Sequence, residues 1–138
     1  MNNKELIKIA IEAMNHSYSP YSDFKVGAAL LTTSGNVFTG CNIENASFSP
    51  TNCAERTAFY KAISEGERGF SKIAVVGGIN GNLTDYTFPC GVCRQVMIEF
   101  CNEDFLVIIA KSEDEYIEHK LSELLPHSFT SSDLGGEL

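Results

Sequence analysis

Two unbroken apolar runs limit the folds that are open to this chain of 138 residues. Residues 26–31 and residues 105–110 contain no polar side chain. A strand that is apolar along its whole length needs cover on both faces, as in a sheet packed between helices. Residues 4–15 and 53–65 place apolar side chains at helical spacing and can supply that cover. The sequence therefore predicts an α/β fold.

The other elements alternate in the same way along the chain. The turn-forming residues 32–36 should join the first strand to a second strand over residues 37–41 in a hairpin. Further along we expect a strand, a helix, a strand, an edge strand and a helical turn, over residues 73–76, 92–101, 105–110, 116–119 and 121–125. This alternation predicts an α/β sandwich around a mixed sheet. The sequence shows no repeats and no linker, so residues 1–138 are expected to form a single domain.

The charge of the chain bears on the kind of partner it has. Ten basic residues against eighteen acidic ones give a formal net charge of −8, which would repel a nucleic-acid backbone. A small molecule is therefore the expected partner. The first residues lack the apolar stretch of a signal peptide, and no aliphatic run is long enough to span a bilayer. We expect a cytoplasmic protein without a membrane partner, in which closely spaced cysteines bind metal more often than they form disulfides.

Three of the five cysteines stand at the predicted starts of helices. Cys53 begins one helix, and Cys90 and Cys93 lie at the entrance of the next. Unpaired backbone N–H groups and the helix dipole stabilise a thiolate there, which is the form that binds zinc. The spacing of Cys90 and Cys93 places both sulfurs on one side of the first turn. Three thiolate ligands leave one tetrahedral position open, which is typical of catalytic zinc.

Two charged residues follow Cys53 directly in the predicted helix. If the helix N-terminus points at the metal, the Glu55 side chain can reach back over the helix end without being a ligand. A carboxylate there can take a proton from water and return it to a substrate. Arg56 can donate hydrogen bonds to the cysteine sulfurs and offset the net negative charge of a three-thiolate zinc site.

Each part of this pattern also has a simpler reading. An isolated Cys-x-x-Cys pair is more often a structural zinc knuckle or a redox pair than a catalytic centre. Structural zinc needs a fourth ligand, and Cys41 is open as that ligand. Cys101 lies two helical turns from Cys93, too far to share the metal, so Cys41 and Cys101 are most simply core residues. Arg56 can equally be a surface residue that pairs with an acidic neighbour.

Longer segments of the sequence favour the catalytic interpretation of the cysteines over the structural one. Cys-Ala-Glu followed by Pro-Cys-x-x-Cys is similar to the signature of the zinc deaminases. The segments YSPYSDFKVGAAL, GCNIENASF, NCAERTA, PCGVCRQ and ELLPHSF resemble the small cytidine deaminases, in order and over almost the whole chain. The resemblance implies a three-layer α/β/α sandwich around a five-stranded mixed sheet, with one Zn²⁺ per subunit. It also implies hydrolysis of cytidine and deoxycytidine to uridine, deoxyuridine and ammonia in pyrimidine salvage.

The same resemblance implies a substrate site that crosses subunits of a homotetramer. Asn42 and Glu44 would bind the sugar hydroxyls, and the backbone at Ala54 would read the pyrimidine. Phe24 would pack on the pyrimidine, and Phe129 of another subunit would do the same. Simple core packing is the alternative for Phe24 and Phe129, and a solvated loop carboxylate is the alternative for Glu44.

Two residues depart from the family pattern, which commonly has tyrosine at Phe48 and serine at Phe88. The first departure removes a hydroxyl associated with the 5′ end of the sugar. Other functions remain to be separated from cytidine deamination. These are a deaminase of the same fold for an aminoacyl-nucleoside antibiotic, a polynucleotide deaminase, which the acidic charge disfavours, and a structural-zinc binding module in which Glu55 is dispensable.

Overall fold

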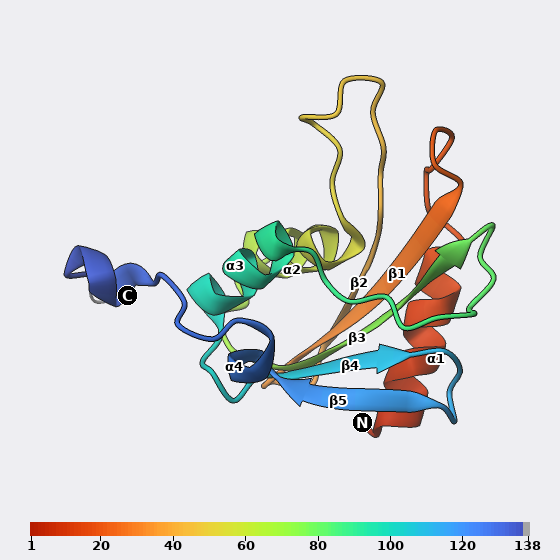
Figure 1. Cartoon of the computed structure of the whole chain (residues 1–138). Helices are drawn as coiled ribbons and strands as arrows, with labels where there is room; N and C mark the ends of the chain where they lie inside the picture. The colour runs from red at the N-terminus through yellow and green to blue at the C-terminus, as the bar shows by residue number, and fades with distance from the viewer. Residues whose placement is uncertain (137–138) are drawn as a thin grey trace.

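The fold is built on one mixed sheet, seen in a computed structural model that describes residues 1–136 (Figure 1). The strand order is β2-β1-β3-β4-β5. β3 and β4 are parallel, and every other neighbouring pair is antiparallel. The strands are β1 (Phe24–Thr32), β2 (Val37–Cys41), β3 (Phe70–Ile79), β4 (Leu106–Ala110) and β5 (Tyr116–Lys120). The five-stranded mixed sheet is thus confirmed.

Helices cover both faces of this sheet, as the apolar runs predict (Figure 1). α1 packs on one face, and α2, α3 and α4 lie on the other. The helices are α1 (Asn3–Met14), α2 (Ala54–Ser64), α3 (Gly91–Phe100) and α4 (Leu121–Leu124), followed by a 3₁₀ turn, η1 (Ser131–Leu134). None of the helices in the described part of the chain combines the length and apolar character needed to cross a membrane.

β1 shows how the two layers arise from one strand. Ala28 and Leu30 enter the core beneath α2 and α3, whereas Ala29 and Leu31 enter the core beneath α1. Successive side chains of a strand point to opposite faces, so an unbroken apolar strand feeds two cores at once. The three-layer α/β/α arrangement follows directly from that strand.

β1 and β3 extend further than their apolar runs predict. The two strands pair antiparallel from Phe24 opposite Ile79 to Thr32 opposite Phe70, through the polar Lys72 and the glycines of β3. Ladder pairing with a long neighbour overrides the weak strand propensity of those residues. The extension carries Phe24 to the end of the sheet at which the candidate site lies.

A glycine sets the distance between α2 and the sheet. A side-chain carbon on Gly40 of β2 would lie 2.2 Å from the carbonyl oxygen of Ala54 and 2.6 Å from the amide nitrogen of Ala58. Only glycine therefore allows α2 to lie directly on β2. This close approach brings the N-terminus of α2 to the end of β2, beside the loop that carries Asn42 and Glu44.

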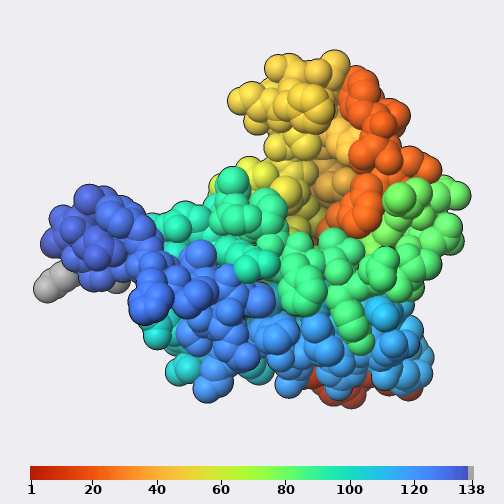
Figure 2. All heavy atoms as spheres, in the orientation of Figure 1, coloured from red at the N-terminus to blue at the C-terminus, as the bar shows by residue number. Residues whose placement is uncertain are grey.

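Two segments project from the compact body (Figures 1 and 2). One is the loop of residues 42–52, together with residues 17–23, which contact it through the Tyr18–Ile43 bridge. The other is the C-terminal arm, residues 126–136, which includes η1. The loop places Phe48 89% exposed, and the arm places Phe129 60% exposed. Both segments present aromatic side chains to solvent.

Candidate active site

The N-termini of α2 and α3 form the centre of the candidate site. Cys53 is the N-cap residue of α2, and Cys90 is the N-cap residue of α3. Neither helix receives a side-chain capping hydrogen bond, so the backbone N–H groups of the first turns remain directed at the site. The predicted placement of the cysteines at helix starts is confirmed. The positive ends of two helix dipoles therefore act on the sulfurs.

The three sulfurs have the spacing of a zinc site. The Cys53 and Cys90 sulfurs are 3.7 Å apart, the Cys90 and Cys93 sulfurs are 3.5 Å apart, and all three lie within 4.8 Å of one another. Zinc–sulfur bonds in tetrahedral geometry place two ligand sulfurs about 3.8 Å apart. The cysteines are free thiols and not disulfides. The donor set therefore fits Zn²⁺, and these three residues could hold it.

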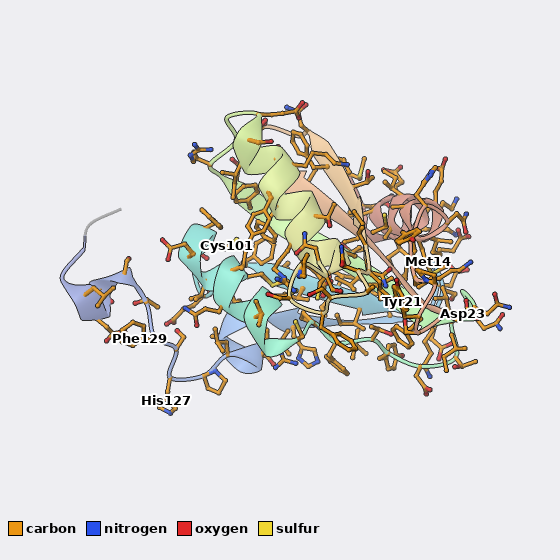
Figure 3. All side chains as sticks on the ribbon, turned by 90° about the horizontal axis from the view of Figure 1, so that it is seen from above. Met14, Tyr21, Asp23, Cys101, His127 and Phe129 are labelled. Atoms are coloured by element: carbon orange, nitrogen blue, oxygen red, sulfur yellow. The ribbon has the colours of Figure 1, made fainter. Side chains whose placement is uncertain are left out.

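Cys41 and Cys101 do not join this cluster. In the described part of the chain, the group of potential metal ligands consists of Cys53, Cys90 and Cys93 alone. Cys101 is the C-cap residue at the far end of α3 (Figure 3), and burial raises its pKa to about 12. The structural-zinc alternative, with Cys41 as fourth ligand, therefore has no support in the geometry. Three ligands leave a position for another molecule.

Glu55 lies beside the cysteines but outside the ligand group. Its side chain is only 4% exposed, and the residue lines a cavity of about 180 Å³ together with Cys53, Ala54 and Cys90. Burial raises the pKa of Glu55 to about 7. A carboxyl group in this position can reach a small molecule in the cavity and exchange a proton with it.

Arg56 contacts the cysteine cluster directly. Its Nη2 atom lies 3.2 Å from the Cys53 sulfur and donates a hydrogen bond to it. Donation from the Cys93 thiol and from Arg56 lowers the pKa of Cys53 to about 5. The same thiol contact, together with burial, raises the pKa of Cys93. The position of Arg56 is therefore not that of a free surface arginine.

Asn42 and Glu44 line the same cavity; Asn42 is held by β1 and by Ser17, and Glu44 is held by the loop of residues 17–23. The Asn42 Oδ1 atom accepts hydrogen bonds from the Val26 amide, at 2.9 Å, and from the Ser17 hydroxyl. Its Nδ2 atom donates to the Phe24 carbonyl oxygen at 2.7 Å. Glu44 accepts from the Tyr21 and Ser22 amides and from the Ser22 hydroxyl.

The two aromatic residues implied for the pyrimidine lie elsewhere. Phe24 lines an adjoining cavity of about 390 Å³, which shares Thr87 with the cysteine cavity. Phe129 lies on the arm, at the opposite end of the molecule from Tyr21 (Figure 3). The Gln95 side chain donates to the Phe129 carbonyl oxygen at 2.8 Å and fixes the arm to α3. The chain does not bring its own Phe129 to its own cysteine cavity.

Several residues of the site lie outside the sequence-based prediction. The cavity is also lined by Val26, Thr51, Asn52, Thr87 and Phe88. Ser17 and Ser22 hold Asn42 and Glu44 from the preceding loop. Both serines lie in the polar residues 16–23, and Ser22 also lies in the segment YSPYSDFKVGAAL, but short polar side chains in loops are too common to indicate particular contacts.

The fold and the site together define a class of protein. Three thiols at two helix N-termini, with an open metal position and a buried carboxyl group beside them, form the centre of a metal-dependent hydrolytic enzyme.

Comparisons identify the family. The model of the "cytidine and deoxycytidylate deaminase zinc-binding region" matches residues 1–109. Cytidine deaminase of Halalkalibacterium halodurans is 49% identical over 97% of this chain and 98% of that protein, and cytidine deaminase of Sporosarcina psychrophila is 46% identical over 97% and 96%. The crystal structure of cytidine deaminase from Burkholderia pseudomallei is 44% identical and covers 94% of this chain and 100% of its own, with a TM-score of 0.86. The chain belongs to the cytidine and deoxycytidylate deaminase family, a family of zinc-binding hydrolytic deaminases.

Proposed function

We propose that this chain hydrolyses cytidine and deoxycytidine to uridine and deoxyuridine and releases ammonia. The observation that carries the proposal is the cluster of three sulfurs at zinc spacing with the buried Glu55 beside it. A nucleoside is favoured over a nucleotide or a nucleic acid, because the residues that line the cavity include no lysine or arginine and the net charge is −8. The proposal includes a single domain over residues 1–138 and a role in cytoplasmic pyrimidine salvage.

In the proposed mechanism Cys53, Cys90 and Cys93 hold the zinc ion. Bound zinc lowers the pKa of water to about 7 and so makes a nucleophile available at neutral pH. Glu55 would accept a proton from the attacking water and pass it to N3 of the ring, which makes C4 electrophilic towards the water oxygen. Glu55 would then take the proton of the new C4 hydroxyl and deliver it to the amino group, so that the C4–N bond breaks, ammonia leaves and the C4 carbonyl forms. Arg56 offsets the thiolate charge through its contact with the Cys53 sulfur.

The remaining residues would hold the nucleoside for this reaction. Asn42 and Glu44 are proposed to bind the sugar hydroxyls, and the backbone N–H and carbonyl groups around Ala54 and Cys90 to read the ring carbonyl and the amino group. Phe24 is proposed to pack on the pyrimidine from the adjoining cavity. A pocket of this kind accelerates the reaction only as far as it binds the tetrahedral species at C4 better than the flat ring.

The function is tested by ammonia release from cytidine, measured together with zinc content. The purified protein should carry one zinc per chain and turn over cytidine. Removal of the zinc with a chelator should abolish turnover, and added Zn²⁺ should restore it. A protein that binds zinc but releases no ammonia from cytidine would contradict the proposed function and support a structural metal site.

We also propose that the chain forms a homotetramer in which Phe129 completes the site of a neighbour. The projection of the arm, the exposure of Phe129 and its distance from its own cysteine cavity support this arrangement (Figures 2 and 3). The exposed Phe48 of the other projecting segment suits the same kind of contact. Since Phe48 lacks a hydroxyl, it can contribute only apolar contact there.

Mixed assemblies test the shared site. Phe129→Ala should raise KM or lower kcat, although Phe129 is distant in sequence from every cysteine of the cluster. Mixing Phe129→Ala chains with Glu55→Gln chains should recover part of the activity, because a hybrid assembly can contain an intact site. The control is a mixture of Glu55→Gln chains with Cys90→Ser chains. Each of these changes damages the cysteine cavity of the chain that carries it, so no hybrid assembly contains an intact site and no activity should be recovered. Absence of recovery after verified subunit exchange would contradict sharing.

A further inference from the structure

The hydroxyl of Ser22 joins two residues of the candidate substrate site. Its oxygen donates a hydrogen bond to Oε2 of Glu44 and accepts one from the backbone N–H of Phe24, at 3.0 Å. One small group thereby connects the carboxylate proposed for the sugar with the aromatic residue proposed for the pyrimidine. Serine can do this because its hydroxyl is both a donor and an acceptor.

Glu44 depends on this loop for its orientation. It follows β2, in the projecting loop, and would be free to turn into solvent without a partner. Its Oε1 atom accepts from the Tyr21 amide at 3.0 Å and from the Ser22 amide at 3.1 Å. Among the described residues, the Ser22 hydroxyl is the hydrogen-bond donor to Oε2. These contacts lower the pKa of Glu44, led by the Ser22 hydroxyl, and keep the carboxylate ionised.

The carboxylate retains room for a ligand. An ionised carboxylate has about four acceptor positions, and the contacts with Tyr21 and Ser22 occupy three of them. Glu44 lines both the cysteine cavity and a neighbouring cavity of about 220 Å³, and Ser22 lines the second of these. Ser22 thus holds Glu44 from the neighbouring cavity, and Glu44 stands between the two cavities. A group held in its bound orientation costs less entropy when the ligand arrives.

We infer that Ser22 is a positioning residue for sugar recognition, which acts by fixing the Glu44 carboxylate towards the cysteine cavity. The inference rests on the proposed function, because it assigns Glu44 to the sugar hydroxyls. It extends that function to a residue that touches neither the metal site nor the ring. Ser17 of the same loop also donates its hydroxyl to the Asn42 side chain, which Phe24 and Val26 of β1 hold as well.

Steady-state kinetics of Ser22→Ala test the inference. Loss of a hydrogen bond to a charged group should raise KM for cytidine about tenfold, with kcat changed by less than about twofold. For 2′,3′-dideoxycytidine, which lacks both hydroxyls that Glu44 can bind, kcat/KM of Ser22→Ala and of the wild type should agree within about twofold. Ser22→Thr, which keeps the hydroxyl, should restore the wild-type KM. Ser34→Ala, in the turn at the other end of the β1–β2 hairpin, is the control and should leave both constants unchanged.

The results of these experiments show whether the role of Ser22 or the proposed sugar contact of Glu44 is wrong. An unchanged KM for cytidine in Ser22→Ala would overturn the inference. So would an equal loss of kcat/KM with both nucleosides, because that loss would reflect Phe24 or the loop as a whole. If Ser22→Ala does not fold, Ser22→Cys keeps the side-chain shape with a much weaker donor and should show the same difference between the substrates. If Glu44→Ala leaves cytidine turnover intact, the proposed sugar contact itself is wrong.

Discussion

Replacing Glu55 by glutamine should abolish turnover while the protein keeps its zinc and its fold. Glutamine has the shape of glutamate but cannot carry a proton between water, N3 and the departing ammonia. General acid–base catalysis contributes about 10²–10⁴-fold, and Glu55 is proposed to serve more than one proton transfer, so kcat should fall by at least about 10⁴-fold. The measurement is kcat from ammonia release, combined with the zinc content of the variant.

The Glu55→Gln change should not destabilise the fold, because a buried carboxyl group gains nothing in stability from its charge. Burial of Glu55 raises its pKa to about 7, so in the metal-free protein the stability falls as the pH rises from the ordinary value of 4.5 towards 7, where the unfolded chain binds fewer protons than the folded one. Glutamine has no such loss, and Glu55→Gln should unfold at no lower temperature than the wild type at pH 8. The control is Glu65→Gln, at the exposed C-cap of α2, which should keep full activity. Retention of more than about a tenth of the wild-type kcat would exclude Glu55 as the proton carrier.

Much of the fold could be predicted from residue patterns because these patterns report burial. Residues 26–31 are apolar on both faces, and the structure places Ala28 and Ala29 in different cores on the two sides of the sheet. The ends of β1 and β3 could not be predicted in this way. Phe24 and Lys72 enter strands because the neighbouring strand offers a ladder, and that is a long-range effect.

The residues of the candidate site likewise include some that could be predicted from the sequence and some that could not. The cluster of Cys53, Cys90 and Cys93 with Glu55 beside it could be predicted because metal chemistry restricts both residue type and spacing, and because two helix starts bring the three sulfurs together. Ser22 could not be predicted, since its contact with Glu44 joins two loops that are far apart in sequence. Phe129 is 60% exposed and does not line its own cysteine cavity, and a hydrophobic residue in this segment of the sequence does not by itself specify a contact. Its role stays a prediction for the mixed-assembly experiment.

The sugar should decide which cytosine compounds are substrates. Asn42 and Glu44 line the cysteine cavity, and their contacts within the described structure leave the second N–H of the Asn42 amide and a fourth acceptor position of the Glu44 carboxylate for a nucleoside. When the sugar is missing, these buried or oriented groups lose their partner, and sites built on such hydrogen bonds reject the truncated analogue by about 10⁴–10⁵-fold. Free cytosine should therefore be a very poor substrate, although it contains the whole reacting ring. Cytidine and deoxycytidine should both react, since both carry the 3′ hydroxyl.

Cytidine monophosphate should fail for a different reason. No lysine or arginine is among the described residues that line the cysteine cavity or the neighbouring cavity of about 220 Å³. The apolar Ala46 and Phe48 line the second of these cavities. A phosphate dianion would lose its hydration there without a cationic partner, and the net charge of −8 adds repulsion. The measurement is kcat/KM for ammonia release from the four compounds.

Glu44→Ala then separates sugar recognition from recognition of the ring. The variant should lose most of its kcat/KM for cytidine, on the order of 10–100-fold for one hydrogen bond to a charged group, and almost none of its slow reaction with cytosine, because cytosine never reaches Glu44. Glu99→Ala, an exposed glutamate on α3, should leave all four substrates unchanged. If cytosine or the monophosphate rivals cytidine in the wild type, the cavity is not built around a nucleoside. If Glu44→Ala slows cytosine as much as cytidine, the carboxylate supports the loop and not the sugar.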